Sequence, residues 1–95
     1  MEKNNTLLFN MISKKYTYDI LKCLENESKR FKDIRIACEG EKMRAQRLKE
    51  LETNGLIHVT VKRVGRRPVS FYKLSEKGNA ILKILDEMKN AMKKL

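Results

Sequence analysis

Hydrophobic residues in the middle of the chain first follow helical spacing and then alternate with polar residues. Leu48 and Leu51 lie on one face of a predicted helix that begins near Glu41. The pair Asn54-Gly55 follows this helix. Glycine commonly ends a helix because it tolerates a left-handed backbone, so the pattern predicts that the helix ends close to Asn54.

A hairpin is predicted directly after this helix. Residues 57–61, IHVTV, alternate apolar and polar side chains, which is typical of a half-buried strand. Residues 69–74, VSFYKL, are rich in β-branched and aromatic residues and predict the return strand. The connection RVGRRP holds three arginines, a glycine and the only proline of the chain. The predicted hairpin therefore has an arginine-rich tip.

Helical spacing also precedes the central helix. Residues 14–26 predict a helix with apolar positions at i, i+4, i+7 and i+8. These positions are Tyr16, Ile20, Cys23 and Leu24. Residues 29–31 predict a short strand, residues 31–38 a second helix, and Glu39-Gly40 the turn before the central helix.

Both ends of the chain carry apolar positions that could pack on the chain's own core or on a second copy. Residues 1–13 contain a dense apolar cluster, and Ser75 is a good N-cap for a long helix over residues 75–95. Apolar positions of that helix step by four, three, four and three, which is the spacing of a coiled-coil seam and also of a core-facing stripe. We expect a dimer contact at both ends. Its expected residues are Leu7, Leu8, Met11, Ile12, Ile81, Leu85, Met88, Met92 and Leu95.

Charge indicates the kind of partner. The 95 residues hold 22 Lys and Arg against 12 Asp and Glu, a net charge of +10, and an excess this large predicts a polyanion such as nucleic acid. Residues 41–68 alone hold eight basic and three acidic residues. The length predicts one domain, with an N-terminal segment (1–13), a core (14–74) and a C-terminal helix (75–95).

Several motifs resemble those of winged helix-turn-helix transcriptional regulators. NGLI, the GRRP tip and FYKLSEKG look like the end of a recognition helix, a wing and its return strand. Upstream, SKKYTYDILKCLENESKRFKDI is similar to the corresponding run of HxlR-like regulators. HxlR-like and PadR-like families are the nearest resemblance, with ArsR-like and MarR-like proteins further off.

This resemblance implies a mostly α fold with a small antiparallel sheet (α+β) and terminal dimerisation helices. In HxlR-like regulators the N-terminal helix packs at the dimer interface. The chain departs from the family in three places. No cysteine precedes Cys23, where HxlR-like proteins carry an N-terminal one. The turn CEGEKM before the recognition helix is a residue or two short and lacks the usual serine or threonine, and Arg44 stands where the family usually has an apolar residue. Arg44 is expected either to extend toward phosphate or to be held by an acidic partner.

A helix-turn-helix inserts its second helix into the major groove, where lysine or arginine can bind guanine and glutamine can bind adenine. An arginine-rich hairpin beside that helix suits phosphates or a narrow minor groove. Both faces could instead be ordinary solvated surface. Expected base contacts are Lys42, Met43, Gln46 and Arg47. Expected phosphate or minor-groove contacts are Arg44, Lys49, Lys62, Arg63, Arg66 and Arg67.

Other chemistry finds little support in the sequence. His58 is the only histidine and falls on the polar face of a predicted strand, without a neighbouring nucleophile. Cys23 and Cys38 stand fifteen positions apart in apolar settings and are expected in the core. We therefore expect no catalysis, metal or cofactor. No apolar run is long enough for a signal peptide or membrane span, so a cytoplasmic protein is expected.

The sequence thus predicts a homodimeric repressor that binds specific double-stranded DNA. Two rivals remain: an architectural DNA-binding protein with little base specificity, and a winged-helix module that binds proteins. Neither the operator nor an effector can be read from the residues.

Overall fold

The computed structural model describes residues 2–95, with side chains from Thr6 onward. Met1, the first residue of the predicted N-terminal segment, lies outside this range. The elements in chain order are α1 (Glu2–Ile12), α2 (Thr17–Cys23), β1 (Lys29–Arg30), the 3-10 helix η1 (Phe31–Ile36), α3 (Glu41–Thr53), β2 (Ile57–Val64), β3 (Arg67–Leu74) and α4 (Glu76–Lys93).

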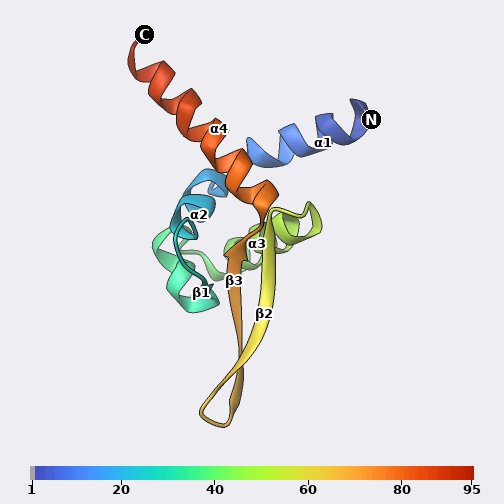
Figure 1. Cartoon of the computed structure of the whole chain (residues 1–95), viewed down its shortest axis with the longest axis vertical. Helices are drawn as coiled ribbons and strands as arrows, with labels where there is room; N and C mark the ends of the chain where they lie inside the picture. Colours follow the sequence, from blue (N-terminus) through green and yellow to red (C-terminus); the bar gives the residue numbers. More distant parts are fainter. Residues whose placement is uncertain (1) are drawn as a thin grey trace.

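The three strands form an antiparallel sheet in the order β1-β3-β2. Strands β2 and β3 pair along their full length, from Ile57 opposite Leu74 to Val64 opposite Arg67. The turn between them contains Gly65, whose φ of 67° is a left-handed value that favours glycine. Figure 1 shows the far half of this hairpin projecting from the helices as a wing. The predicted winged helix-turn-helix fold, mostly α with a small antiparallel sheet, is confirmed.

The sequence signals at the ends of α3 and α4 are also confirmed. Gly55 has a φ of 76°, and its N–H and that of Leu56 return to carbonyls in the last turn of α3. Such a pair of bonds after a left-handed glycine is the Schellman termination. At α4, the Ser75 hydroxyl accepts a 3.0 Å hydrogen bond from the Gly78 N–H, the expected N-cap contact.

The two helices before α3 are shorter than predicted. Helix α2 covers residues 17–23, because Tyr16 has a φ of 74° and separates α2 from α1. The Thr17 hydroxyl donates to the Met11 carbonyl at 3.1 Å across this break. The second predicted helix is the 3-10 helix η1, which ends at Ile36 instead of Cys38. The predicted strand over residues 29–31 is the two-residue β1.

One core joins α2, η1, α3, the base of the sheet and the start of α4. Its fully buried side chains include Ile20, Leu21, Leu48, Leu51 and Leu56, and of these the helical pattern predicted Ile20, Leu48 and Leu51. Among the cysteines, Cys38 is buried as expected, whereas Cys23 is only half-buried. Burial raises the pKa of the Cys23 thiol.

Helices α1 and α4 leave this core as two arms (Figure 1). Polar contacts hold α4 against α2 up to Asp86, which accepts a 2.6 Å hydrogen bond from the Tyr18 hydroxyl and lies 3.1 Å from Lys22 Nζ. These two contacts lower the pKa of the Asp86 carboxyl. The wing and α4 extend in opposite directions along the longest axis, which measures 50 Å.

Within the arms, the residues predicted for a dimer divide into two groups. Met11 is 5% exposed and belongs to the chain's own core, so its assignment to a dimer interface is wrong. Leu8, Ile12, Ile81 and Leu85 are partly buried against that same core. The exposed members are Leu7, Met88, Met92 and Leu95. The buried and partly buried residues pack within the chain's own core because the start of α4 lies over α2 and the end of α1 packs against the same core.

Gly78 provides a test of how α4 is seated. A Cβ at this position would lie 2.0 Å from the Leu56 carbonyl oxygen, a backbone atom that cannot move aside cheaply. Alanine normally stabilises a helix interior over glycine by roughly 0.5–1 kcal/mol, but overpacking costs about 1–3 kcal/mol. We expect Gly78→Ala to lower the melting temperature. Asn79→Ala, an exposed change on the same turn, should leave it nearly unchanged. An equal or higher melting temperature for Gly78→Ala would contradict the close approach.

Candidate nucleic-acid interface

The outer face of α3 presents a short row of polar and basic side chains. Lys42, Met43, Gln46 and Lys49 are all exposed, whereas Leu48 and Leu51 on the opposite face are buried. Helix α3 follows η1 through the turn at residues 37–40. It therefore has the place of the second helix in a helix-turn-helix, which enters the major groove.

Arg47 does not belong to this outer face. Its side chain is only 5% exposed. Its Nε donates to the Lys15 carbonyl at 3.0 Å, and its Nη1 donates to the Glu50 carboxylate. Its Nη2 lies 3.1 Å from the Met43 sulfur. The prediction that Arg47 projects outward to read bases is therefore wrong, because the guanidinium is bound between α3 and the junction of α1 and α2.

Glu50 extends the same contact. Its carboxylate also accepts a 2.9 Å hydrogen bond from Lys14 Nζ. Burial raises the pKa of Glu50, but the hydrogen bonds from Lys14 and Arg47 outweigh burial and leave the pKa below its usual value. Lys14 and Lys15 precede α2 directly. These contacts therefore fix the orientation of α3 relative to the end of α1.

Arg44 is the second buried arginine, with 6% of its surface exposed. Its Nε donates to the Cys38 carbonyl at 2.8 Å, and its two terminal nitrogens donate to the carbonyls of Phe31 at 3.2 Å and Glu39 at 2.8 Å. The guanidinium also lies 4.6 Å from the centre of the Phe31 ring. Neither expected role fits this geometry: the guanidinium is buried and donates to three backbone carbonyls, so it does not extend to the surface, and its partners are not acidic side chains.

The wing carries the remaining predicted residues, and all of them are exposed. Lys62 Nζ lies 5.1 Å from the centre of the Phe71 ring. Arg63 Nη1 donates to the Arg66 carbonyl at 3.1 Å across the turn, which leaves its other nitrogens free. Arg66 and Arg67 are exposed as well. The hairpin therefore presents four cationic side chains beyond the helical core.

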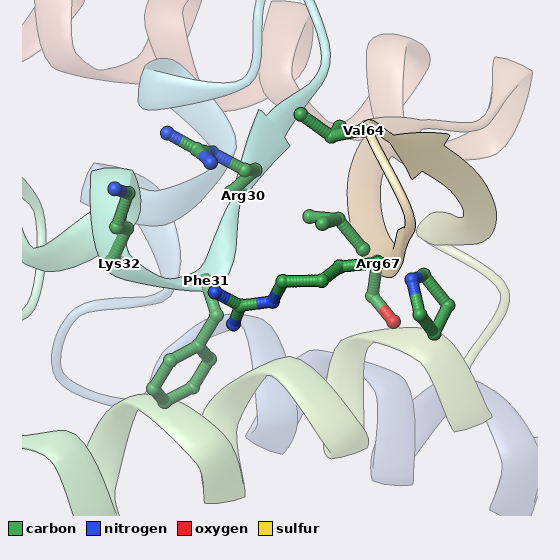
Figure 2. Close-up of a pocket in the computed structure, with 8 residues that line it drawn as sticks. Arg30, Phe31, Lys32, Val64 and Arg67 are labelled. Carbon is green, nitrogen blue, oxygen red and sulfur yellow. The ribbon is translucent and has the colours of Figure 1, made fainter.

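Two basic residues that the sequence analysis did not single out as contacts lie beside the wing. Arg30 and Lys32 share a cavity of about 460 Å³ with Arg67 and Ser70 of β3. Figure 2 shows Arg67 extending from the hairpin toward Phe31, with Arg30 and Lys32 on the facing wall. The signal available in the sequence was the run KRFK at residues 29–32, with three basic residues around one aromatic.

The described side chains, from Thr6 onward, bring together no group of three or more His, Cys, Asp and Glu residues suited to a metal ion. His58 is exposed on β2, as its position in the alternating run predicted. No helix of the described residues is both long and apolar enough to span a membrane.

Comparison with known proteins places this geometry in a family context. The HxlR-like helix-turn-helix family matches residues 11–95. The chain is 37% identical over 83 residues to the HTH-type transcriptional regulator YodB of Bacillus subtilis (strain 168), which covers 84% of this chain and 72% of that protein.

Solved structures agree with this match. The crystal structure of diamide-treated YodB from B. subtilis superposes with a TM-score of 0.81 at 30% identity, covering 95% of this chain and 90% of that one. A regulator of the MarR family from Enterococcus faecalis V583 superposes with a TM-score of 0.84 at 22% identity, covering 98% and 86% of the two chains, and supports the fold alone.

The role of Arg44 can be tested by stability. Arg44→Met removes the donors to three carbonyls, and leaving a buried acceptor without a partner costs roughly 1–3 kcal/mol. We expect the free energy of unfolding, measured by urea denaturation, to fall by at least about that amount. Lys42→Met is the matched control on the exposed face and should change the stability little. Equal stability of the two variants would show that the carbonyls do not depend on Arg44.

Proposed function

Because the chain belongs to the HxlR-like helix-turn-helix family and is a DNA-binding transcription regulator, we propose that it acts as a homodimeric, sequence-specific repressor. The observation that carries this proposal is the pairing of an exposed polar row on α3 with four exposed cations on the wing. Occupation of a promoter by such a dimer blocks transcription. The corresponding location is the cytoplasm.

Base reading falls to the residues that remain exposed on α3. Lys42 can donate to guanine and Gln46 can form a bidentate pair with adenine in the major groove. Met43 offers an apolar surface for a thymine methyl group. Lys49, further along the helix, is suited to a phosphate. The buried Arg44 and Arg47 have no part in this contact.

The wing contributes affinity. Its four basic side chains lie on a hairpin that projects past the helices, where a guanidinium can contact phosphate or enter a narrow minor groove. Contacts of this kind depend strongly on salt because they release counterions from the DNA. They position the protein without adding much base preference.

The two arms support a dimer. At the end of α4, Met92 is 57% exposed and Leu95 is fully exposed. On α1, Leu7 is 60% exposed and Phe9 is 62% exposed. Ile84 and Met88 extend the apolar surface of α4 toward the core. Contiguous apolar surface of this kind marks an interaction site. A second copy covers it symmetrically and presents two recognition helices to an approximately palindromic site.

One observation favours a second candidate function, an architectural DNA-binding protein. With Arg47 buried, α3 offers no arginine to the bases, and arginine makes the commonest specific contact with guanine. Selection of bound sites from random duplex DNA separates the two functions. A defined, near-palindromic consensus supports the repressor, whereas an unselected pool supports the architectural role.

We expect Gln46→Ala and Arg66→Ala to have different effects on DNA binding. Gln46→Ala should relax the selected preference at one position per half-site and cost about 1–3 kcal/mol on the preferred site. Arg66→Ala should weaken binding to all sequences alike and lower the salt slope by roughly one unit. An unchanged consensus for Gln46→Ala would remove that residue from base reading, and an unchanged slope for Arg66→Ala would remove it from phosphate contact.

The dimer can be tested on the distal half of α4. Met88→Glu combined with Met92→Glu places carboxylates on the exposed apolar face, so sedimentation should show a monomer while circular dichroism retains the helices. Binding to a two-half-site operator should then fall toward that of one half-site. Asn90→Glu, on the other side of the same helix, is the control and should remain dimeric. A parent protein that sediments as a monomer at micromolar concentration would contradict the proposal.

A further inference from the structure

We propose that the cavity between β1, η1 and the wing binds a phosphate group of the DNA backbone, held by Arg30, Lys32 and Arg67. This inference rests on the proposed DNA-binding function and adds residues from outside both the recognition helix and the wing tip. The cavity is about 460 Å³ in volume and open to solvent, and Ser70 is among its lining residues. Three basic residues, Arg30, Lys32 and Arg67, therefore line the same cavity (Figure 2).

The charges around the cavity are incompletely balanced. Asp33 is the acidic partner of Arg30, but its carboxylate lies 3.4 Å from Nε, a long contact between half-exposed side chains. A phosphate oxygen can displace or supplement so weak a pair. Lys32 and Arg67 are both exposed. Like charges drawn into one concavity repel each other, and an anion between them removes that repulsion.

The backbone on one side of the cavity is held in place. Arg30 pairs with Phe71 in the sheet, and the next residue, Phe31, is fixed by Arg44. The Arg44 guanidinium accounts for both contacts, since it lies against the Phe31 ring and donates to the Phe31 carbonyl. The backbone that carries Arg30 and Lys32 therefore keeps a fixed position relative to α3. Side chains on a fixed backbone lose less entropy on binding than side chains on a mobile loop.

The other side of the cavity belongs to the wing. Arg67 is the first residue of β3, directly opposite Val64 of β2, and its side chain extends back toward Phe31. Val64, Pro68 and Val69 complete this wall with apolar surface. An apolar wall beside three cations suits a sugar next to its phosphate better than it suits a free, fully hydrated anion. A phosphate bound here links the wing to η1 and fixes the angle between the wing and α3.

The test compares the salt dependence of duplex binding for the parent protein, Arg30→Gln and Lys32→Gln. Each variant should lower the salt slope by roughly one unit while the selected consensus stays the same. Lys83→Gln, an equal change of charge at an exposed site on α4, should keep the parent slope. Circular dichroism checks the fold, and Lys32→Gln, which removes no hydrogen bond or ion pair of the described side chains, keeps the test valid should Arg30→Gln be unstable.

Failure of this inference is distinguishable from failure of the proposed function. If the parent binds duplex DNA with a clear consensus but Lys32→Gln and Arg30→Gln keep its slope, the cavity does not hold backbone phosphate. If, in addition, inorganic phosphate shifts the NMR signals of residues 30–32 and these shifts vanish in the variants, the cavity is a site for a free anion, which also overturns the inference. A parent that shows no salt-dependent duplex binding overturns both.

Discussion

The hydrogen bonds of the buried Arg44 guanidinium are the constraint on which the helix-turn-helix depends. Three carbonyls, at residues 31, 38 and 39, accept hydrogen bonds from this one guanidinium at the junction of η1 and α3. A buried carbonyl without a donor is costly, and a guanidinium offers donors in several directions at once. No buried side-chain polar atom among the described residues lacks a partner. One side chain therefore satisfies the turn and fixes the angle at which α3 leaves it.

A basic residue in the sequence is consequently not the same as a basic surface. Residues 41–68 hold eight Lys and Arg, and two of these, Arg44 and Arg47, are used inside the structure. The DNA-facing charge on α3 is correspondingly smaller, whereas Arg30 and Lys32, outside that range, add to it beside the wing. The interface proposed here therefore shifts from the recognition helix toward the wing and the start of η1. The salt-dependent part of the binding free energy, which comes from phosphate contacts, is then large relative to the part that comes from base contacts.

Local signals predicted most of the fold, because they act within a few residues. Gly55 ends α3, Ser75 begins α4, and the alternation before Gly65 gives β2, each through a contact or backbone angle close in sequence. The errors lie where distant residues meet. Arg47 is buried by the Lys15 carbonyl, 32 positions away, and the cavity joins Arg30 to a strand that begins at Arg67. Helical spacing places Arg47 four residues before Leu51, at the edge of the buried face of α3, but it carries no information about the second element that covers the side chain.

The same limit explains the divided role of α4. Apolar positions recur every three or four residues along the whole helix, but those up to Leu85 pack on the core whereas Met88 and Met92 are exposed. The hydrogen bonds to α2 end at Asp86, and one turn later Lys89 Nζ lies over the Tyr18 ring. In the proposed dimer, the distal turns meet the partner while α1 lies beside the same junction. Arg47 and Glu50 tie α3 to Lys14 and Lys15 at the end of α1. The spacing of the two recognition helices is then set by the arms through these two side chains.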